Sequence, residues 1–252
     1  MELIVSKDYA SLSKAGADVV AEKVAANPSA ALLLATGSTP MGLYQELAAR
    51  REHGAFDPSR LRVVQLDEYL GIGPDDRRSL YGWMRHAFVE PLGIQHANVI
   101  RLPGDAPDPD AACRAYDEAV RKIGGIDLAI LGLGPNGHLG FNEPATDPAA
   151  STRIVDLTEE SIESNGRYWG GREHVPRQAM TAGMTTLLKA RRTLLVVSGT
   201  HKRTILAQTL AGPMTPNVPA SFLQAAANVT VLADRDAAGS DVARAWKGLP
   251  AR

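Results

Sequence analysis

Short apolar runs alternate with longer amphipathic stretches along this chain, and this alternation constrains its fold more than any other feature. Buried strands are predicted where the runs are continuous, at 30–35, 61–66, 98–102, 126–131, 193–198 and 229–233. Helix-length stretches with apolar side chains on one face lie between them, at 9–26, 109–122 and 200–211. Strands that alternate with helices form βαβ units, so we expect an α/β fold whose mainly parallel sheet carries helices on both faces.

The whole chain, 1–252, is expected to form a single α/β domain, because no repeat or linker divides it and this length suits one such domain. Residues 144–180 depart from the regular alternation. They are polar, contain Asn165-Gly166 and Gly170-Gly171, and have few apolar runs. This pattern indicates helix and loop lying over the rest of the domain, either as a lid or as an ordinary surface insertion.

Charge and cysteine content exclude several classes of protein. A net charge of -1 provides no global field for nucleic acid or an anionic membrane. The lone cysteine, Cys113, excludes an intrachain disulfide and cysteine-based metal sites, and it is expected to be a small buried side chain in a helix. The histidines lack metal-binding spacing, so we expect no metal. Glu2 stands where a signal peptide would be basic, and no apolar run approaches a membrane span, so we expect a cytoplasmic protein.

Residues 31–50 combine a buried strand, a turn and a helix in an arrangement typical of anion sites. The strand leads into Gly37-Ser38-Thr39, and Pro40 follows at a position favoured in the first helical turn, with Ser38 or Thr39 as the natural N-cap. Free N–H groups at such a helix start favour phosphate. No nucleotide-binding glycine motif is present, so the loop is either a phosphate site of another kind or a plain turn.

Two adjacent acids, Asp67 and Glu68, follow the second predicted strand. The carboxyl ends of parallel strands meet at one edge of a sheet, so a carboxylate here would lie beside the first loop and could act as a general base. The alternative is structural, with Asp67 capping the next turn and Glu68 in solvent.

Residues 132–144, GLGPNGHLGFNEP, are the densest functional signal in the chain. Their closely spaced glycines allow tight turns directly after a strand, and His138 and Glu143 are fixed within these turns. Histidine exchanges protons most readily near neutral pH, and a carboxylate can orient it. We therefore favour a functional role for His138 over a structural one.

The segments ATGSTPMGLY, LDEYLG, GLGPNGHLGFNEP and GTHK, in this order, resemble the glucosamine-6-phosphate deaminase family, which shares a superfamily with the 6-phosphogluconolactonases. The resemblance extends from about residue 30 to 233 and implies a modified Rossmann-like fold. It implies conversion of an amino-hexose 6-phosphate and water to a ketose 6-phosphate and ammonia, without a cofactor.

The resemblance also implies roles for individual residues. Asp67 would move a proton between C2 and C1 of the opened sugar, and His138, assisted by Glu143, would open the pyranose ring. The 6-phosphate would lie on Gly37-Ser38-Thr39, the loop described above. Permanent cationic charge suits such a site, and the resemblance assigns that task to Arg167 and Lys202.

The chain departs from the family pattern at Asn136, where the family commonly has aspartate. Asparagine preserves shape but loses the charge that would stabilise a protonated His138, although Glu143 offers a second carboxylate. The sequence around Asn136 also resembles the galactosamine-6-phosphate branch. The effect on turnover and the configuration of the sugar therefore stay open.

A second departure concerns regulation. Some family members are hexamers activated by an N-acetylamino sugar phosphate that basic residues bind after the N-E-P segment. Here Arg153 is followed by Val155 and Asp156, and Asp156 would repel a phosphate. We therefore expect that activation to be lost, whether the chain acts as a monomer, dimer or hexamer.

Two rival functions remain. A 6-phosphogluconolactonase would share the phosphate loop and the histidine turn but usually carries D-E-R where this chain has Asp67-Glu68-Tyr69, and it lacks N-E-P. A catalytically weak sugar-phosphate-binding regulator is the second rival, motivated by Asn136. The intact Asp67, His138 and Glu143 argue against it.

Overall fold

The computed structural model describes residues 1–247, and within them seven parallel strands form the larger of two sheets, in the order β1-β10-β9-β6-β2-β3-β5. The strands are β1 (Glu2–Ser6), β2 (Ala31–Leu34), β3 (Arg62–Gln65), β5 (Val99–Ile100), β6 (Leu128–Gly132), β9 (Thr193–Val197) and β10 (Val229–Asp234). All the strands predicted from apolar runs belong to this sheet, which confirms the predicted fold class. β1 was not predicted, because most of its side chains at this edge of the sheet are not buried.

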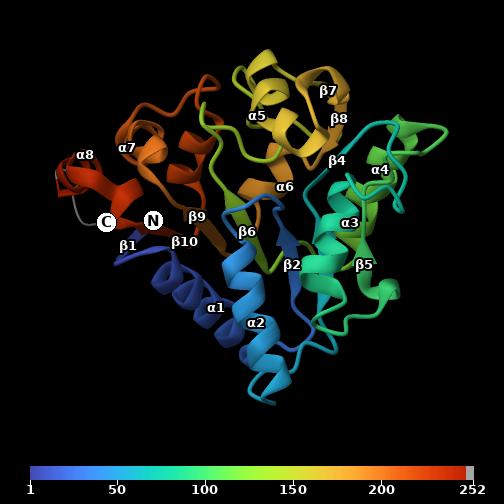
Figure 1. The fold of residues 1–252 in the computed structure, drawn as a ribbon, viewed down its shortest axis with the longest axis horizontal. Coiled ribbons are helices and arrows are strands. Elements are labelled where there is room, and N and C mark those ends of the chain that lie inside the picture. The colour runs from blue at the N-terminus through green and yellow to red at the C-terminus, as the bar shows by residue number, and fades with distance from the viewer. Residues whose placement is uncertain (248–252) are drawn as a thin grey trace.

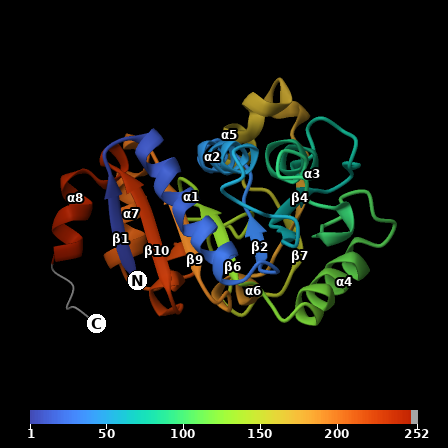
Figure 2. The same ribbon diagram turned by 90° about the horizontal axis from the view of Figure 1, so that it is seen from below.

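Helices cover both faces of this sheet (Figures 1 and 2). One face packs against α1 (Tyr9–Ala26), α2 (Met41–Glu52) and α3 (Leu80–Met84), and the other against α4 (Pro109–Lys122), α6 (Met184–Leu188), α7 (Arg203–Ala211) and α8 (Arg235–Lys247). β2 shows why its apolar run is continuous. Leu32 and Leu34 join one buried cluster and Leu33 joins the other, because successive side chains of a strand point to opposite faces.

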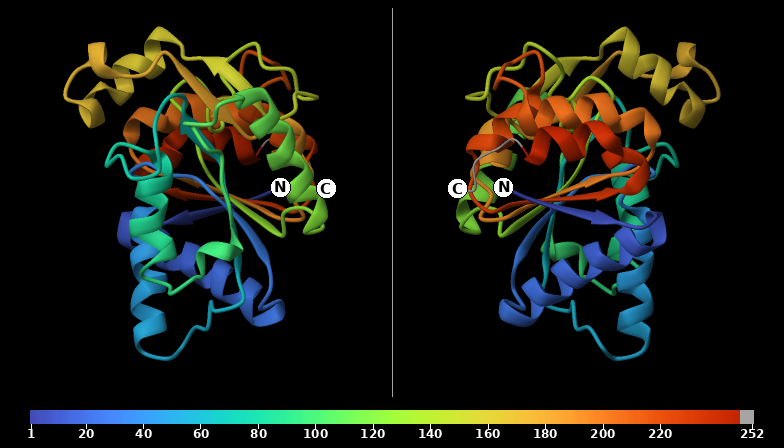
Figure 3. Two further views of the ribbon diagram at one scale, coloured as in Figure 1. Left: turned by 90° about the vertical axis from the view of Figure 1, so that its right-hand side faces the viewer. Right: turned by 90° about the vertical axis from the view of Figure 1, so that its left-hand side faces the viewer.

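The segment predicted as a lid contributes a helix and two of the three strands of a smaller antiparallel sheet. The strands are β4 (Asp67–Tyr69), β7 (Arg153–Asp156) and β8 (Gln178–Thr181), paired in the order β4-β8-β7, and the helix is α5 (Glu159–Trp169). The prediction of helix and loop is wrong for β7 and β8, whose four residues are too short for a clear period-2 pattern. Figure 3 shows this segment, in yellow, projecting beyond the larger sheet.

The helices predicted at 109–122 and 200–211 begin in different ways. Asp108 caps α4, its carboxylate accepting the N–H of Ala111 at 2.9 Å. The helix predicted from residue 200 begins as a 3-10 turn (Thr200–Lys202) before α7.

Cys113 is buried in α4 as expected, and burial raises its thiol pKa to about 11. No helix within residues 1–247 has both the length and the apolarity to cross a bilayer.

Candidate active site

The three predicted motifs meet in one cavity of about 820 Å³ at the carboxyl edge of the larger sheet. It is lined by the turn 36–40, Asp67, the turn 132–135, His138, Ser164, Asn165, the end of α5 at 167–169, and residues 201–202, among others. The parallel strands explain this convergence, since β2 and β6 are neighbours and their following loops leave the sheet side by side. Most of the predicted site residues therefore face one space.

The predicted phosphate loop is held by a side chain that the sequence did not indicate. Gly37 has a φ of 99°, a conformation that favours glycine. Pro40, and not Ser38 or Thr39, is the N-cap of α2, and it forms no side-chain capping bond, so that prediction is wrong. Instead the Tyr9 hydroxyl accepts the N–H of Gly42 at 2.9 Å and lies 3.0 Å from the carbonyl oxygens of Ser38 and Thr39. The turn is therefore held through its backbone, and the hydroxyls of Ser38 and Thr39 do not cap α2.

Asp67 is buried without compensating contacts. Its side chain accepts no hydrogen bond from any residue in the described part of the chain, although the residue is only 7% exposed. Burial, and then the neighbouring charge of Glu68, raise the pKa of Asp67 to about 8. A carboxyl of this kind exchanges a proton near neutral pH, as a general base must.

Glu68 has the opposite environment, although it is the next residue. Its carboxylate accepts the backbone N–H groups of Tyr69, Leu80 and Tyr81, each at 2.9 Å, and the Gln65 amide at 3.2 Å. Burial raises its pKa, and these hydrogen bonds oppose the rise. The interpretation of Glu68 as solvated is wrong. It is a buried anchor that joins β4 to the start of α3, because a buried carboxylate requires such donors.

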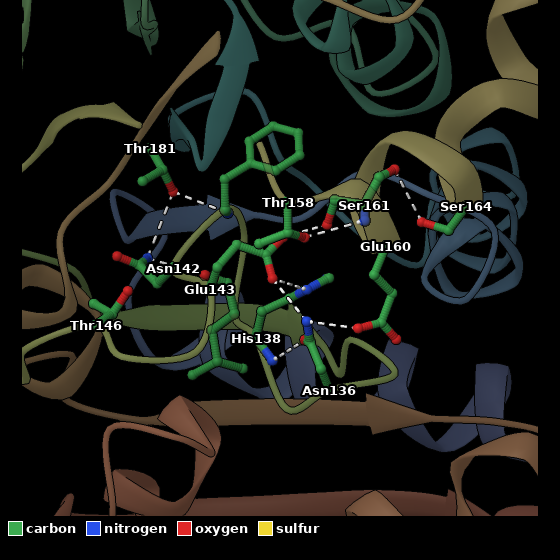
Figure 4. A network of polar contacts seen from close by, with 12 residues as sticks. Asn136, His138, Asn142, Glu143, Thr146, Thr158, Glu160, Ser161, Ser164 and Thr181 are labelled. Atoms are coloured by element: carbon green, nitrogen blue, oxygen red, sulfur yellow. Dashed lines mark hydrogen bonds and ion pairs between the residues drawn. The ribbon is translucent and has the colours of Figure 1, made fainter. Parts of the chain in front are cut away.

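His138 and Glu143 form a contact pair, with Nδ1 of the ring 3.1 Å from Oε2 of the carboxylate (Figure 4). Asn136 joins the pair, since its amide nitrogen donates to Glu143 at 2.9 Å and its oxygen accepts the backbone N–H of His138 at 3.2 Å. Ser161 donates to the other oxygen of Glu143. Burial alone would raise the pKa of Glu143, but His138, Ser161 and Asn136 together lower it.

The glycine turn is shaped around the imidazole. A Cβ on Gly134 would lie 2.1 Å from Cδ2 of His138, so any side chain there would displace the ring. Gly140, with a φ of 61°, passes close to the cavity base: a Cβ there would be 3.3 Å from Oδ2 of Asp67. The glycines therefore allow the histidine and the carboxylate to lie beside backbone.

Cationic side chains also line the cavity. Lys202 is half-buried, and burial followed by the charge of Arg167 lowers its pKa to about 8. The same two cations contribute to a lowered pKa of His201, after burial. Arg167 lies over the Tyr168 ring at 4.6 Å and donates to its hydroxyl. Burial and Arg167 thus outweigh the charge of Glu160 on Lys202, and a bound phosphate would stabilise the protonated ammonium.

Aromatic side chains close the cavity and were not predicted as a group. Tyr69 packs edge-on against Trp169 at 5.0 Å, Trp83 against Tyr168 at 5.2 Å, and Arg78 lies over Trp169. Residues 69–83 and 168–169 are far apart in the sequence, so their contact could not be predicted from it. The aromatic character of these side chains was the only signal in the sequence. Among the described residues, no three His, Cys, Asp or Glu side chains are grouped as a metal site.

Arg153, expected to be a remnant of an activator site, has structural partners. Its guanidinium is half-buried, a condition that lowers its pKa, and it donates to Asn142 at 2.9 Å and to Thr146 at 3.2 Å. Asp156 accepts from the Gln178 amide across the small sheet. Arg153 thus ties β7 to the N-E-P turn, while the loss of activation stays a prediction.

The comparison with known sequences agrees with this geometry. The family model described as glucosamine-6-phosphate isomerases/6-phosphogluconolactonase matches residues 8–232. A glucosamine-6-phosphate deaminase of Halothermothrix orenii is 42% identical, over 94% of this chain and 99% of its own length. Another, of Corynebacterium aurimucosum, is 41% identical over 94% of this chain and 93% of its own.

Among solved structures, a deaminase is more similar to this chain than a lactonase is. A structure described as a monomeric glucosamine-6-phosphate deaminase superposes with a TM-score of 0.92 at 36% identity, covering 94% of this chain and 99% of that one. The 6-phosphogluconolactonase of Trypanosoma cruzi superposes with a TM-score of 0.75 at 22% identity, covering 94% of this chain and 95% of its own. The second similarity concerns the fold alone.

Proposed function

The chain belongs to the family of glucosamine-6-phosphate isomerases and 6-phosphogluconolactonases, and from this premise we propose that it is a glucosamine-6-phosphate deaminase. The reaction converts glucosamine 6-phosphate and water to the ketose 6-phosphate and ammonia. One observation carries the proposal: a carboxyl whose pKa is raised to about 8, a histidine and a cationic cluster line a single cavity, and Glu143 contacts that histidine from behind the cavity wall.

The phosphate is bound where the cations and the first loop meet. Lys202 and Arg167 supply charge, and Gly37, Ser38 and Thr39 supply backbone and hydroxyl donors at the start of α2. Binding a dianion there removes the repulsion between the cations. The sugar is then oriented with its C1–C2 end away from this cluster, towards Asp67 and His138.

His138 opens the sugar ring. Its Nδ1 faces Glu143, so Nε2 is the atom that takes the proton from O1 and delivers one to the ring oxygen as the bond between C1 and that oxygen breaks. Glu143 stabilises the protonated imidazole of His138, and Ser161 and Asn136 hold Glu143 in place.

Asp67 moves the proton on carbon. The carboxylate takes the C2 proton of the open aldose while O1 gains a proton, which gives an enol. It then delivers the proton to C1 while the amino nitrogen loses one to solvent, and C2 is left as an imine. Water adds to C2 and ammonia departs, which gives the ketose. Burial makes Asp67 a stronger base than an exposed carboxylate, and its lack of hydrogen bonds among the described residues leaves its oxygens available to substrate.

Residues 144–180 act as a lid over this cavity in our proposal. The support is that the end of α5 brings Arg167, Tyr168 and Trp169 to the cavity wall, whereas the small sheet connects the segment to Asp67 through β4. A bound phosphate would hold the end of α5 through Arg167, and this segment would then exclude water from the reacting carbons.

The site is proposed to be complete within one chain that works in the cytoplasm. All the residues assigned above come from this chain, and the most similar solved structure cited is described as monomeric. A buried, unpaired Cys113 suits a reducing compartment. Light scattering of the active enzyme and fractionation of cells test these two statements.

The deciding experiment is an ammonia assay with glucosamine 6-phosphate and galactosamine 6-phosphate, compared by kcat/KM. We expect ammonia from both or from the glucosamine compound, with the latter preferred. Higher kcat/KM for the galactosamine compound would change the substrate. Acid release from 6-phosphogluconolactone without ammonia would identify a lactonase instead, and binding without turnover of either amino sugar would identify a regulator.

A further inference from the structure

We propose that Glu160 is a positioning residue for the proton transfer at His138, acting through the side-chain amide of Asn136. This inference rests on the proposed deaminase function for its kinetic consequence, but its structural basis is independent. Asn136 Nδ2 lies 2.9 Å from Oε2 of Glu143 and 3.2 Å from Oε2 of Glu160, so its two amide protons serve two carboxylates (Figure 4).

The second carboxylate fixes which way the amide faces. An asparagine side chain presents two donors on one side and an acceptor on the other. With both donors engaged by Glu143 and Glu160, Oδ1 is directed to the backbone N–H of His138 at 3.2 Å. Without Glu160, one amide proton would have no partner among the described residues, and rotation of the amide would break the contact with Glu143 as well.

The contact between Glu160 and Asn136 connects α5 to the histidine–carboxylate pair. Glu160 and Ser161 are both in the first turn of α5, and each reaches the histidine–carboxylate pair: Ser161 directly through Glu143, and Glu160 through Asn136. The other end of α5 carries Arg167 on the cavity wall. The same rigid helix therefore contacts both the ring-opening pair and the phosphate-binding cluster.

Glu160 also affects the cationic cluster directly. Its charge raises the pKa of Lys202, opposing the larger effects of burial and Arg167. Removing Glu160 thus has two separable consequences. The one that passes through Asn136 alters the chemical step and appears in kcat, whereas the one that passes through Lys202 alters phosphate affinity and appears in KM.

A double-mutant cycle separates the two routes. We expect Glu160→Ala to lower kcat about tenfold, as the loss of one charge-assisted hydrogen bond would. Asn136→Ala should lower kcat at least as much. Because Glu160 acts on kcat only through Asn136, adding Glu160→Ala to Asn136→Ala should lower kcat no further. Glu160→Gln, which keeps an acceptor oxygen, should recover most of the activity.

The matched control is Glu159→Ala, one residue earlier in α5, because Glu159 pairs outward with Arg172 and Arg177. It should leave kcat unchanged. Additive losses in the double mutant, or equal losses in Glu159→Ala and Glu160→Ala, would overturn the proposal, since both indicate general damage to α5.

A measurement without substrate makes the test independent of the proposed function. The ¹⁵N chemical shifts of the His138 ring should change in Glu160→Ala and not in Glu159→Ala. Unchanged shifts in Glu160→Ala overturn the positioning role. Absence of ammonia release by the wild-type protein would overturn the deaminase proposal alone, and the ring shifts would still decide the role of Glu160.

Discussion

The strands of the larger sheet begin at one edge, the amino edge, and end at the other, the carboxyl edge. Both edges carry charged side chains, but the environments of these charges are opposite. At the amino edge, Asp127 accepts the N–H of Ala31 at 2.9 Å and pairs with Arg191 at 3.3 Å and Lys23 at 3.9 Å. At the carboxyl edge, Asp67 accepts no hydrogen bond from the described residues, and Lys202 has no ion-pair partner among them.

This contrast separates charges that stabilise the fold from charges that serve a ligand. A satisfied carboxylate such as Asp127 lowers the free energy of the folded chain and has no spare capacity for chemistry. An unsatisfied one such as Asp67 costs stability, and its shifted pKa makes it useful as a base. Cavities occur at both edges, of about 690 Å³ and 820 Å³, so volume does not distinguish them. The cavities differ in whether the charged side chains near them have partners.

Asp67→Asn tests the contrast most strongly. The amide cannot accept the C2 proton, so we expect kcat to fall by about 10²–10⁴-fold, the usual contribution of a general base. The free energy of unfolding should not fall, because the variant removes a buried carboxyl group that accepts no hydrogen bond from the described residues. Ammonia release and thermal unfolding measure the two effects. A kcat close to that of the wild type would remove Asp67 from the mechanism.

Lys202→Met should produce the next largest effect. Loss of a charge-assisted contact of about 1.5–3 kcal/mol corresponds to an increase in KM for the sugar phosphate of about 10- to 100-fold. Exposed Lys189 provides the control as Lys189→Met, which should leave KM unchanged. The same KM increase with a substrate lacking the phosphate would show that Lys202 does not bind that group.

Asp127→Ala is the complementary change at the amino edge. It breaks two ion pairs and leaves the Ala31 N–H without its acceptor, so the free energy of unfolding should fall by about 1–3 kcal/mol. Activity per folded molecule should stay at the wild-type level. Denaturant titration and the ammonia assay provide the comparison, and a large loss of kcat would abolish the distinction between the edges.

The pH profile shows the smallest and most specific effect. Asp67 must be ionised to accept a proton, so kcat/KM should rise towards pH 8, and Lys202 must be protonated to bind phosphate, so it should fall above that value. The optimum should be narrow and lie near pH 8. Lys202→Arg, whose charge persists at higher pH, should extend the alkaline side. A broad plateau in the wild type would contradict both pKa shifts.

Stability should follow the same group. The pKa of Asp67 rises from 3.8 to about 8 on folding, so between these values the folded state holds a proton that the unfolded state releases. This contribution to stability is complete below pH 3.8 and is lost as the pH rises through 8. The wild type should therefore lose stability relative to Asp67→Asn across this interval.

The larger sheet was predictable because burial on both faces leaves a local trace in the sequence. Leu32, Leu33 and Leu34 are consecutive, and each faces helices, so the run is apolar throughout. β4, β7 and β8 leave no such trace. Their three or four residues mix polar and apolar side chains, and they become strands by pairing with each other.

The candidate site likewise has features that the local sequence predicted and features that depend on distant residues. Asp67 and His138 lie in the segments that follow β3 and β6, and a parallel sheet brings the carboxyl ends of its strands to one edge. The environments of Glu68 and Glu160 depend on partners 12 to 24 residues away, at Leu80, Tyr81 and Asn136. Spacing within a motif cannot reveal such partners. The sequence therefore predicted which residues meet and, through the family resemblance, that Asp67 is the base, whereas the buried anchoring contacts of Glu68 appear only in the structure.

The pairing of β1 has a consequence for synthesis of the chain. Among the described residues β1 is the first strand in chain order and its neighbour β10 is the last, with residues 2–6 aligned on 230–234. During translation β1 must wait until residues 230–234 have left the ribosome, with its edge open to other chains. Tyr9, which steadies the phosphate loop, follows directly after β1. We expect nascent chains truncated before residue 229 to have an unanchored phosphate loop, and activity to emerge only when the final strand docks.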